Sequence, residues 1–315
     1  MTVPLAVVLL ALVLPWGAAA AARRLASALP PREAAVAVTG AAVLLAGGTV
    51  AALVGLFHVP FLAGLERVPV SRVLAEWPAA VPVAAVAGAV LALQSVRVAR
   101  RWFEHRRLVR DAWAATARAV PEGDLLVVPG SAPDAFALPG QHRRGGRVVV
   151  TQGMLRALGP AEREVLLAHE RAHLAGHHHV LSVTAYLAAA VHPALRSLLP
   201  VLDFQLERWA DEAAAATVGD RRLAATAIAR AALAGSPGPR ERGNRNPLLS
   251  VSTGPVPLRV EALLGPLPVR PGARPARAAV AGLVTAVVAS ALLAAGLAYG
   301  LHEYVEFAAG AIRGR

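Results

Sequence analysis

Long apolar runs set the polarity pattern of this chain. Four stretches contain no Asp, Glu or Arg: Val3–Ala22, Ala34–Leu65, Trp77–Val96 and Ala278–His302. A helix of about 20 apolar residues spans the hydrocarbon core of a bilayer, and each of the four runs reaches that length. We therefore expect an integral membrane protein with four transmembrane helices. The first three are expected at about 3–22, 34–56 and 77–97, with Phe57–Pro60 leaving the membrane after the second.

The first apolar run could instead be a cleaved signal peptide, since small residues occupy Ala18–Ala22. A signal peptide carries its positive charge ahead of the apolar stretch. Here Met1–Pro4 has no basic side chain, and Arg23 and Arg24 follow the run. The pattern favours a retained helix whose N-terminus faces outward.

Between the third and fourth apolar runs, the pattern changes to that of a globular domain. Branched apolar runs bounded by Pro and Gly predict strands at Asp124–Val128 and Gly145–Thr151, with a turn-rich stretch at 130–136 between them. A helix is expected to begin at Gly159–Pro160, because Pro is favoured at the first helical position. Further helices are expected at 180–200, 203–218 and 221–234, with Asp203 capping the second of these.

Charge gives this arrangement an orientation. The chain has a formal net charge of +12, and Arg supplies all 32 of its basic side chains. The Arg excess lies in residues 23–33, 97–111 and 112–277, whereas Glu66–Glu76 and the C-terminal tail are balanced. Cytoplasmic loops carry the basic excess, so both termini are expected outside the cell membrane and residues 112–277 in the cytoplasm. Because topology accounts for the charge, no direct binding of nucleic acid is expected.

The expected fold class is a multi-pass α-helical membrane protein with a cytoplasmic α+β domain that is mostly helical and has a small β-sheet. Its parts are three transmembrane helices with basic cytoplasmic loops (1–111), the cytoplasmic domain (112–277), and a fourth transmembrane helix with a short external tail (278–315). One alternative topology makes Val180–Leu202 a fifth span, because that stretch is almost as apolar as the others. Residues before and after it would then lie on opposite sides of the membrane.

The absence of Cys narrows the chemistry that this domain can perform. It excludes disulfide frameworks, thiolate zinc sites, iron–sulfur clusters and Cys nucleophiles. A metal site in this chain would have to use imidazole and carboxylate groups.

The most specific chemical signal is the pentad His169-Glu170-Arg171-Ala172-His173 on the helix expected after Pro160. Residues four apart lie on one face of a helix, so His169 and His173 can bind one zinc ion. Glu170 lies beside them and can accept a proton from water. Chance would produce such a pentad about 0.01 times in a chain of this composition.

A catalytic zinc site needs a third protein ligand and one open position. Glu207, on a later expected helix, is the candidate third ligand. Asp211, one turn further on, can accept a hydrogen bond from the second nitrogen of a ligating His. The sequence thus predicts one Zn²⁺ per chain, bound by His169, His173 and Glu207.

Other polar residues carry weaker signals. His177–His179 follow the pentad directly, so the alternative to a metal site is an exposed helix that happens to be rich in His. His177 shares the ligand face and could fill the open position. Tyr186, His192 and His142 could each polarise a carbonyl or stabilise an oxyanion, although a lone His or Tyr is more often structural.

On these residues the chain resembles the gluzincin peptidases, and more narrowly the BlaR/MecR type of integral-membrane zinc metallopeptidase. Beside the pentad, the likeness rests on three spans before the domain, one after it, and the segments Asp134–Phe136, Val148–Thr151, Glu207–Asp211 and Arg259–Leu264. The resemblance implies a gluzincin-type metallopeptidase domain in which Glu170 is the catalytic base. It also implies an edge strand, along which substrate extends, near Asp134, Ala135 and Phe136.

The likeness to the BlaR/MecR type has a limit. Its antibiotic-sensing members carry a large extracellular penicillin-binding domain after the last span, whereas only Leu301–Arg315 is expected outside here. The resemblance implies a zinc endopeptidase that cleaves a cytoplasmic or membrane-proximal protein, with a winged-helix repressor of the BlaI type as partner and a role in signalling. The alternatives are a quality-control peptidase like HtpX or the CAAX proteases, and a non-catalytic membrane receptor or scaffold with a structural zinc site.

Overall fold

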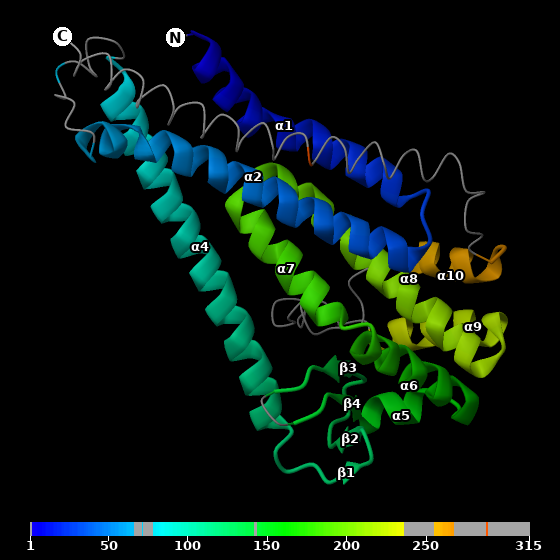
Figure 1. Ribbon diagram of the computed structural model, residues 1–315. Coiled ribbons are helices and arrows are strands. Elements are labelled where there is room, and N and C mark those ends of the chain that lie inside the picture. Colours follow the sequence, from blue (N-terminus) through cyan, green and yellow to red (C-terminus); the bar gives the residue numbers. More distant parts are fainter. Residues whose placement is uncertain are drawn as a thin grey trace.

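The computed structural model describes residues 2–65, 71, 78–141, 144–235, 255–267 and 288. Most of this part of the chain is helical, and a small sheet lies at one end (Figure 1). The helices are α1 (Thr2–Ala26), α2 (Pro31–Leu65), α4 (Ala80–Ala115), α5 (Gln152–Ala157), α6 (Pro160–Ala175), α7 (His178–Val191), α8 (Leu199–Val218), α9 (Arg221–Ala234), α10 (Val256–Leu264) and the 3-10 helix η1 (Pro193–Leu198). The strands are β1 (Pro121–Glu122), β2 (Leu125–Val128), β3 (Ala135–Leu138) and β4 (Arg147–Thr151).

Two helices among the described residues are long and apolar enough to cross a membrane by length and composition. They are α2, over Pro31–His58, and α4. The first expected span falls in α1, whose side chains are described only from Val13 onward. The fourth expected span, 278–302, lies outside the described residues except for Val288. The expected orientation of the termini stays a prediction.

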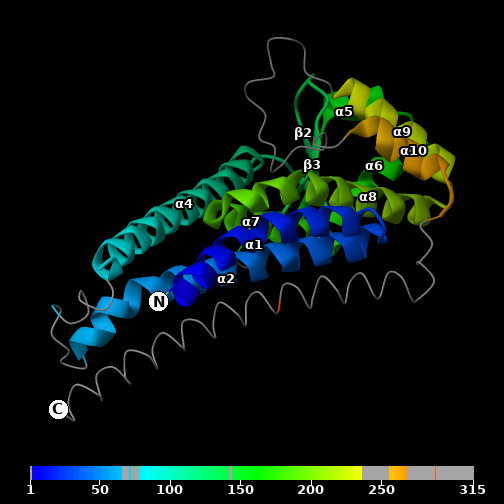
Figure 2. The ribbon, with the colours of Figure 1, turned by 90° about the horizontal axis from the view of Figure 1, so that it is seen from above.

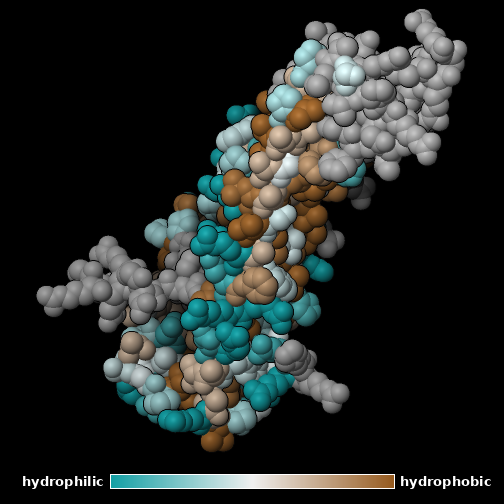
Figure 3. Space-filling view, turned by 90° about the vertical axis from the view of Figure 1, so that its left-hand side faces the viewer, coloured by the Kyte–Doolittle hydropathy of each residue, from teal (hydrophilic) through white to brown (hydrophobic). Residues whose placement is uncertain are grey.

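Both candidate spans are longer helices than the apolar pattern indicates. α2 continues through Phe57–Pro60, where we expected the chain to leave the membrane, and ends at Leu65. α4 continues past residue 111, which we expected to end the membrane part, so this boundary falls inside one helix. Along α4, exposed apolar side chains such as Val86 and Leu93 give way to a run rich in Arg. Figure 3 shows the corresponding change from brown to teal along this face.

The sheet has the strand order β1-β2-β4-β3, so β3 is an edge strand. β2 runs parallel to β4, and β3 runs antiparallel to it, with Ala135 opposite Val150 and Phe136 opposite Val149. The period of two in β4 sends Val148 and Val150 to one face, where they pack with α5, α6 and α9 residues. Val149 packs on the other face with residues that include Trp113 at the end of α4. Both predicted strands are present, and the stretch 130–136, expected as turns, ends inside β3.

The stretch 180–200, expected as one helix, is broken after Val191. His192 has extended backbone angles (φ −134°, ψ 130°), because the following Pro193 disfavours the helical conformation in the residue before it. α7 therefore has only 14 residues and a length of about 21 Å, too short for a hydrocarbon core of about 30 Å. The alternative fifth span at Val180–Leu202 is thus not a continuous helix.

The assignment of Asp203 as a helix cap is wrong. α8 begins at Leu199 with Pro200 in its first turn, so Asp203 lies inside the helix. Its Oδ2 accepts a hydrogen bond from the Tyr186 hydroxyl of α7, at 3.2 Å.

An apolar core holds α7 and α8 against the N-terminal helices. Buried residues of α1, α2, α7, η1 and α8 form one cluster, with Leu195, Leu198 and Leu202 fully enclosed. A side-chain amide crosses this interface, since Gln205 Nε2 donates to the Ala26 carbonyl at 3.2 Å. Figure 2 shows α1 and α2 on one side of α7 and α8, with the sheet on the other. α8 is therefore fixed between the apolar helices and α6.

Candidate metal site

The start of α6 is set by its sequence. Pro160 occupies the first turn, and the Gly159 amide donates to Glu162 Oε2 at 2.8 Å. This hydrogen bond satisfies one of the backbone N–H groups that a helix leaves free at its N-terminus. Val165 and Leu166 are buried on the face that packs against the rest of the domain. His169 and His173 follow on neighbouring turns and project from one side of α6, as their spacing predicts.

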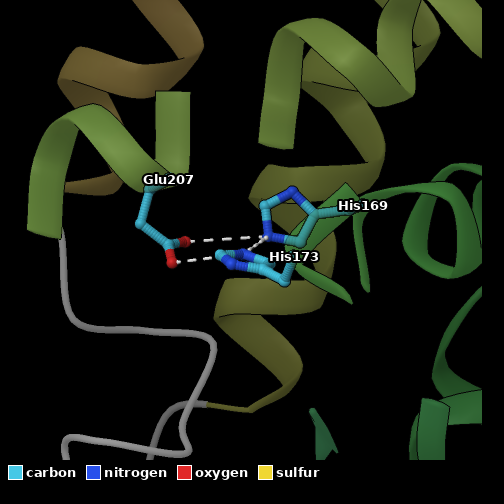
Figure 4. Close-up of side chains that lie close together, drawn as sticks. All are labelled: His169, His173 and Glu207. Atoms are coloured by element: carbon cyan, nitrogen blue, oxygen red, sulfur yellow. Dashed lines mark hydrogen bonds and ion pairs between the residues drawn. The ribbon is translucent and has the colours of Figure 1, made fainter. Parts of the chain in front are cut away.

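α8 brings Glu207 to the two imidazoles. His169 Nε2 lies 3.1 Å from His173 Nε2, and the Glu207 carboxylate lies 3.7 Å from the first nitrogen and 3.4 Å from the second (Figure 4). One ligand atom from each residue lies within 4.8 Å of the others. Two imidazole nitrogens and one carboxylate are the protein donors of many catalytic zinc sites. The three residues therefore fit a zinc ion in type, number and spacing.

A buried ionic network lies behind these three side chains. His169 Nδ1 is 3.0 Å from Asp211 Oδ1, one turn beyond Glu207 on α8. Arg259, on α10, donates to Asp211 through Nε at 2.8 Å and through a terminal nitrogen at 2.6 Å. Its other terminal nitrogen lies 2.7 Å from Glu207 Oε2. One guanidinium thus contacts both the third candidate ligand and the partner of the first.

This network controls the charges of its members. Burial would raise the pKa of Asp211, but the hydrogen bonds from Arg259 and His169 outweigh it and lower that pKa. Burial would also lower the pKa of His169, and the adjacent Asp211 raises it instead. For Glu207, burial dominates and raises the pKa despite the attraction of Arg259. Asp211 is therefore the firmly ionised carboxylate of the network.

Glu170 is 1% exposed and lies beside the candidate ligands. Burial, followed by repulsion from Glu207 and Asp134, raises its pKa to about 7 although His169 and Arg259 oppose the shift. Its Oε1 has no hydrogen-bond partner among the described residues. A carboxyl group with a pKa near neutrality can both accept and release a proton.

Asp134 lies close enough to Glu170 to raise its pKa by charge repulsion, so this edge of the sheet borders the candidate site. Asp134 directly precedes β3, and its backbone N–H donates to the Thr151 hydroxyl at 2.9 Å. Ala135 and Phe136 lie within β3, which pairs with β4 on one side. Asp134, Ala135 and Phe136, which we expected near an edge strand, therefore lie at the start of the edge strand β3, next to the pentad helix α6.

Arg259 is the member of the site that sequence reasoning missed. It is 2% exposed, and it lies on α10 among the apolar residues Val256, Val260 and Leu263. Positions 256, 259, 260 and 263 share one face of a helix. A charged residue on the apolar face of a short helix was the available signal, because such a residue needs a buried partner of opposite charge.

Three His residues follow the pentad. The sequence favours His177 for a place at the metal site, whereas the structure brings His178 there. His177, which we expected to share the ligand face, is exposed in a left-handed turn (φ 49°) between α6 and α7. His178 is buried instead, and its Nδ1 lies 2.8 Å from His173 Nδ1. Burial lowers the pKa of His178 to about 3, so this imidazole is neutral. The left-handed turn redirects the chain, and the helical periodicity of α6 therefore does not extend to His177.

The three weaker candidates are not brought to the ligands as a group. The Tyr186 hydroxyl donates a hydrogen bond to Asp203, one turn before Glu207 on α8. His192 accepts a hydrogen bond from the Ala194 amide and caps η1. It follows α7, whose far end is about 20 Å along the helix from His178. His142 lies outside the described residues.

This geometry defines a class: a site with two His, one Glu and an adjacent buried carboxyl, typical of zinc metallopeptidases. Residues 104–203 match the profile of Peptidase family M48. The matched residues include the pentad and end before Glu207. The family match therefore does not test the third ligand, Asp211 or Arg259.

Two curated relatives carry related names. Over 79 residues, 24% of this chain, the sequence is 38% identical to the protease HtpX homolog of Campylobacter hominis. Over 137 residues, 41% of this chain, it is 36% identical to protease HtpX homolog 1 of Streptomyces coelicolor. The chain spans 27% and 43% of the lengths of these relatives. No solved structure matches it.

Proposed function

We propose that this protein is a zinc-dependent metalloendopeptidase that binds one zinc ion per chain. The observation that carries the proposal is the convergence of His169, His173 and Glu207 within 4.8 Å, with the buried Glu170 beside them. The M48 match over the pentad and the two relatives named as HtpX proteases support it. Among the described residues, the candidate group has three members, the number of protein ligands in a catalytic zinc site, whereas a structural zinc site has four.

Different residues of this chain would have different roles in peptide hydrolysis. A bound zinc ion would supply a Lewis acid, which acidifies water and polarises a carbonyl group. Glu170 would accept the proton of the attacking water and return it to the leaving amine, a transfer that its pKa of about 7 suits. The Asp211–Arg259 pair would hold His169 and Glu207 in place. The outer edge of β3 could pair with an extended substrate backbone.

We propose that the peptidase domain, residues 112–277, faces the cytoplasm and that 1–111 and 278–315 anchor it in the cell membrane. The two apolar helices α2 and α4 and the dense Arg residues at the end of α4 support this arrangement. The substrate would be a cytoplasmic or membrane-proximal protein. The relatives favour an HtpX-like peptidase, and the narrower BlaR/MecR type with a BlaI-type repressor rests on the sequence motifs alone.

The test is Glu170→Gln in the full-length chain, purified in detergent and assayed on unfolded casein. Proteolysis should fall about 10²- to 10⁴-fold because the proton acceptor is lost. Zinc content, measured by mass spectrometry, should stay near one ion per chain. Glu164→Gln, an exposed change on the same helix, is the matched control and should leave both values unchanged. Unchanged proteolysis in Glu170→Gln would sink the proposal.

A further inference from the structure

His173 has both of its ring nitrogens engaged. Nε2 faces the other candidate ligands, 3.1 Å from His169 Nε2 and 3.4 Å from the Glu207 carboxylate. Nδ1 points the opposite way and lies 2.8 Å from His178 Nδ1. A hydrogen bond between two ring nitrogens needs one N–H and one lone pair. If Nε2 of His173 is to bind a metal, its proton must be on Nδ1, and His178 must then be the acceptor.

The environment of His178 keeps its ring in this position. The residue is 2% exposed in the first turn of α7. Its ring packs against Trp209 of α8, with centroids 4.4 Å apart, and stands edge-on to His173 at 4.7 Å. Gly176 leaves room for it, because a Cβ atom at that position would collide with the His178 ring. His173, Trp209 and Gly176 thus confine the His178 imidazole on the side of His173 that faces away from the other candidate ligands.

The two His residues of the pentad therefore have different partners. His169 faces the carboxylate of Asp211, which is itself held by Arg259. His173 faces a second imidazole, supplied by the residue that follows the left-handed turn at His177. In each case the second nitrogen of the ligand ring meets a buried acceptor, the arrangement that fixes the tautomer of metal-binding His residues.

We propose that His178 is a positioning residue: it accepts the Nδ1 proton of His173 and fixes that ring with Nε2 toward the metal position. The inference rests on the proposed function, since it concerns the zinc site of that function. Outer partners of ligating His residues typically contribute 10- to 100-fold to metal affinity. His178 itself makes no contact with the metal and takes no part in the proton transfers of Glu170.

Two substitutions separate the acceptor from the bulk of the ring. His178→Leu and His178→Asn remove the ring and its packing on Trp209 to a similar degree. Asn retains an acceptor, because its amide oxygen can lie near the position of Nδ1. His177→Ala is the matched control within the same His run, since His177 is exposed and has no place in the ligand group.

The measurement is the zinc affinity of each full-length variant in detergent, by competition with a chelator. We expect one tight zinc ion in the wild type and in His177→Ala, and 10- to 100-fold weaker binding in His178→Leu. His178→Asn should recover most of the loss. In the metal-free protein, ¹⁵N shifts of labelled His should show the Nδ1–H form of His173 in the wild type and in His178→Asn, and a mixture of tautomers in His178→Leu.

Equal zinc affinity in His178→Leu and the wild type would overturn the inference and leave the zinc site standing. Equal weakening in the Leu and Asn variants would also overturn it, because packing alone would then explain the loss. A wild type that binds no zinc would instead overturn the proposed function. If His178→Leu fails to fold, His178→Ala, which also lacks an acceptor, replaces it in the comparison with His178→Asn, with the His173 tautomer and the zinc affinity as readouts.

Discussion

The two halves of the candidate site are built in different ways. In the first half, α6 alone supplies His169, Glu170 and His173, and helix geometry places them. In the second half, Glu207 reaches the site from α8, and a buried Arg259 on α10 holds it there. In the sequence, α9 and the chain that follows it separate Arg259 from the carboxylates that it contacts. No local sequence pattern therefore predicts these contacts.

This difference predicts how each half of the site responds to amino-acid substitutions. The α6 half depends on an ordinary helix, so a change of one functional group there should alter chemistry and leave the fold intact. The second half contains a guanidinium that is 2% exposed and pairs with two carboxylates of another helix, Glu207 and Asp211 of α8. Loss of one member leaves an uncompensated buried charge. Fold and metal binding should therefore fail together on that side.

The largest expected effect comes from Arg259→Met. The change leaves Asp211 and Glu207 buried without their cationic partner, and the free energy of unfolding should fall by about 3–5 kcal/mol. Thermal unfolding of the metal-free chain in detergent measures the loss, and zinc content should fall with it. Unchanged stability and zinc binding in Arg259→Met would show that α10 is not part of the site. The contrast between the two halves of the site would then not hold.

Arg221→Met is the matched control for that experiment. Arg221 joins the same helices, since it pairs with Glu212 of α8 and donates to the Leu263 and Ala262 carbonyls of α10. It lies closer to solvent than Arg259 and contacts neither Glu207 nor Asp211 in these hydrogen bonds. We expect a smaller loss of stability and unchanged zinc content.

Asp211→Asn should have the next largest effect: metal affinity falls, and stability falls with it because the buried Arg259 loses one of its carboxylate partners. The substitution keeps the shape but removes the charge that faces His169 Nδ1 at 3.0 Å. Zinc affinity should fall about 10- to 100-fold, the usual contribution of a carboxylate behind a ligating His. Chelator competition measures this, with Glu212→Gln as the neighbouring control on α8. A loss in the control as large as in Asp211→Asn would point to α8 as a whole rather than to this contact.

The α6 half could be predicted from the sequence because its determinants are local. Pro160 and Glu162 mark the helix start, and the four-residue spacing places both imidazoles on one side. The strands at 125–128 and 147–151 were likewise predictable from branched residues bounded by turns. Glu207 and Asp211 could be proposed only as candidates, since their approach to α6 depends on helix packing.

The remaining features depend on contacts between distant segments or on single backbone angles. Arg259 contacts Asp211 across 48 positions of the chain, and no periodicity records such a pairing. The left-handed turn at His177 exchanges the places of His177 and His178 relative to a continued helix. Asp203 was misplaced because Pro200 starts α8 earlier than the polar pattern indicates. Each error arose where a tertiary contact or one residue's conformation overrode the helical pattern.

The smallest expected effect lies on the outer face of the pentad helix. Arg171, inside the pentad, donates to both carboxylate oxygens of Asp124 at 2.7 and 2.8 Å and ties α6 to the start of β2. Both side chains are about half exposed, so solvent screens the pair, and Asp124→Asn should cost only about 0.5–1 kcal/mol of stability and leave zinc content unchanged. Thermal unfolding of the two chains across pH measures the difference.

The sign of the pH dependence follows from the pKa of Asp124, which the hydrogen bond from Arg171 lowers below its usual value. A carboxyl group whose pKa is lowered by folding stabilises the fold above its unfolded pKa of about 3.9. That stabilisation is lost as the pH falls through the lowered folded value. The gap between wild type and Asp124→Asn should thus be constant above about pH 5 and close in strong acid. A gap that persists in acid, or a loss of zinc in this variant, would mean that a distant contact also sets the α6 half, and the contrast between the two halves would fail.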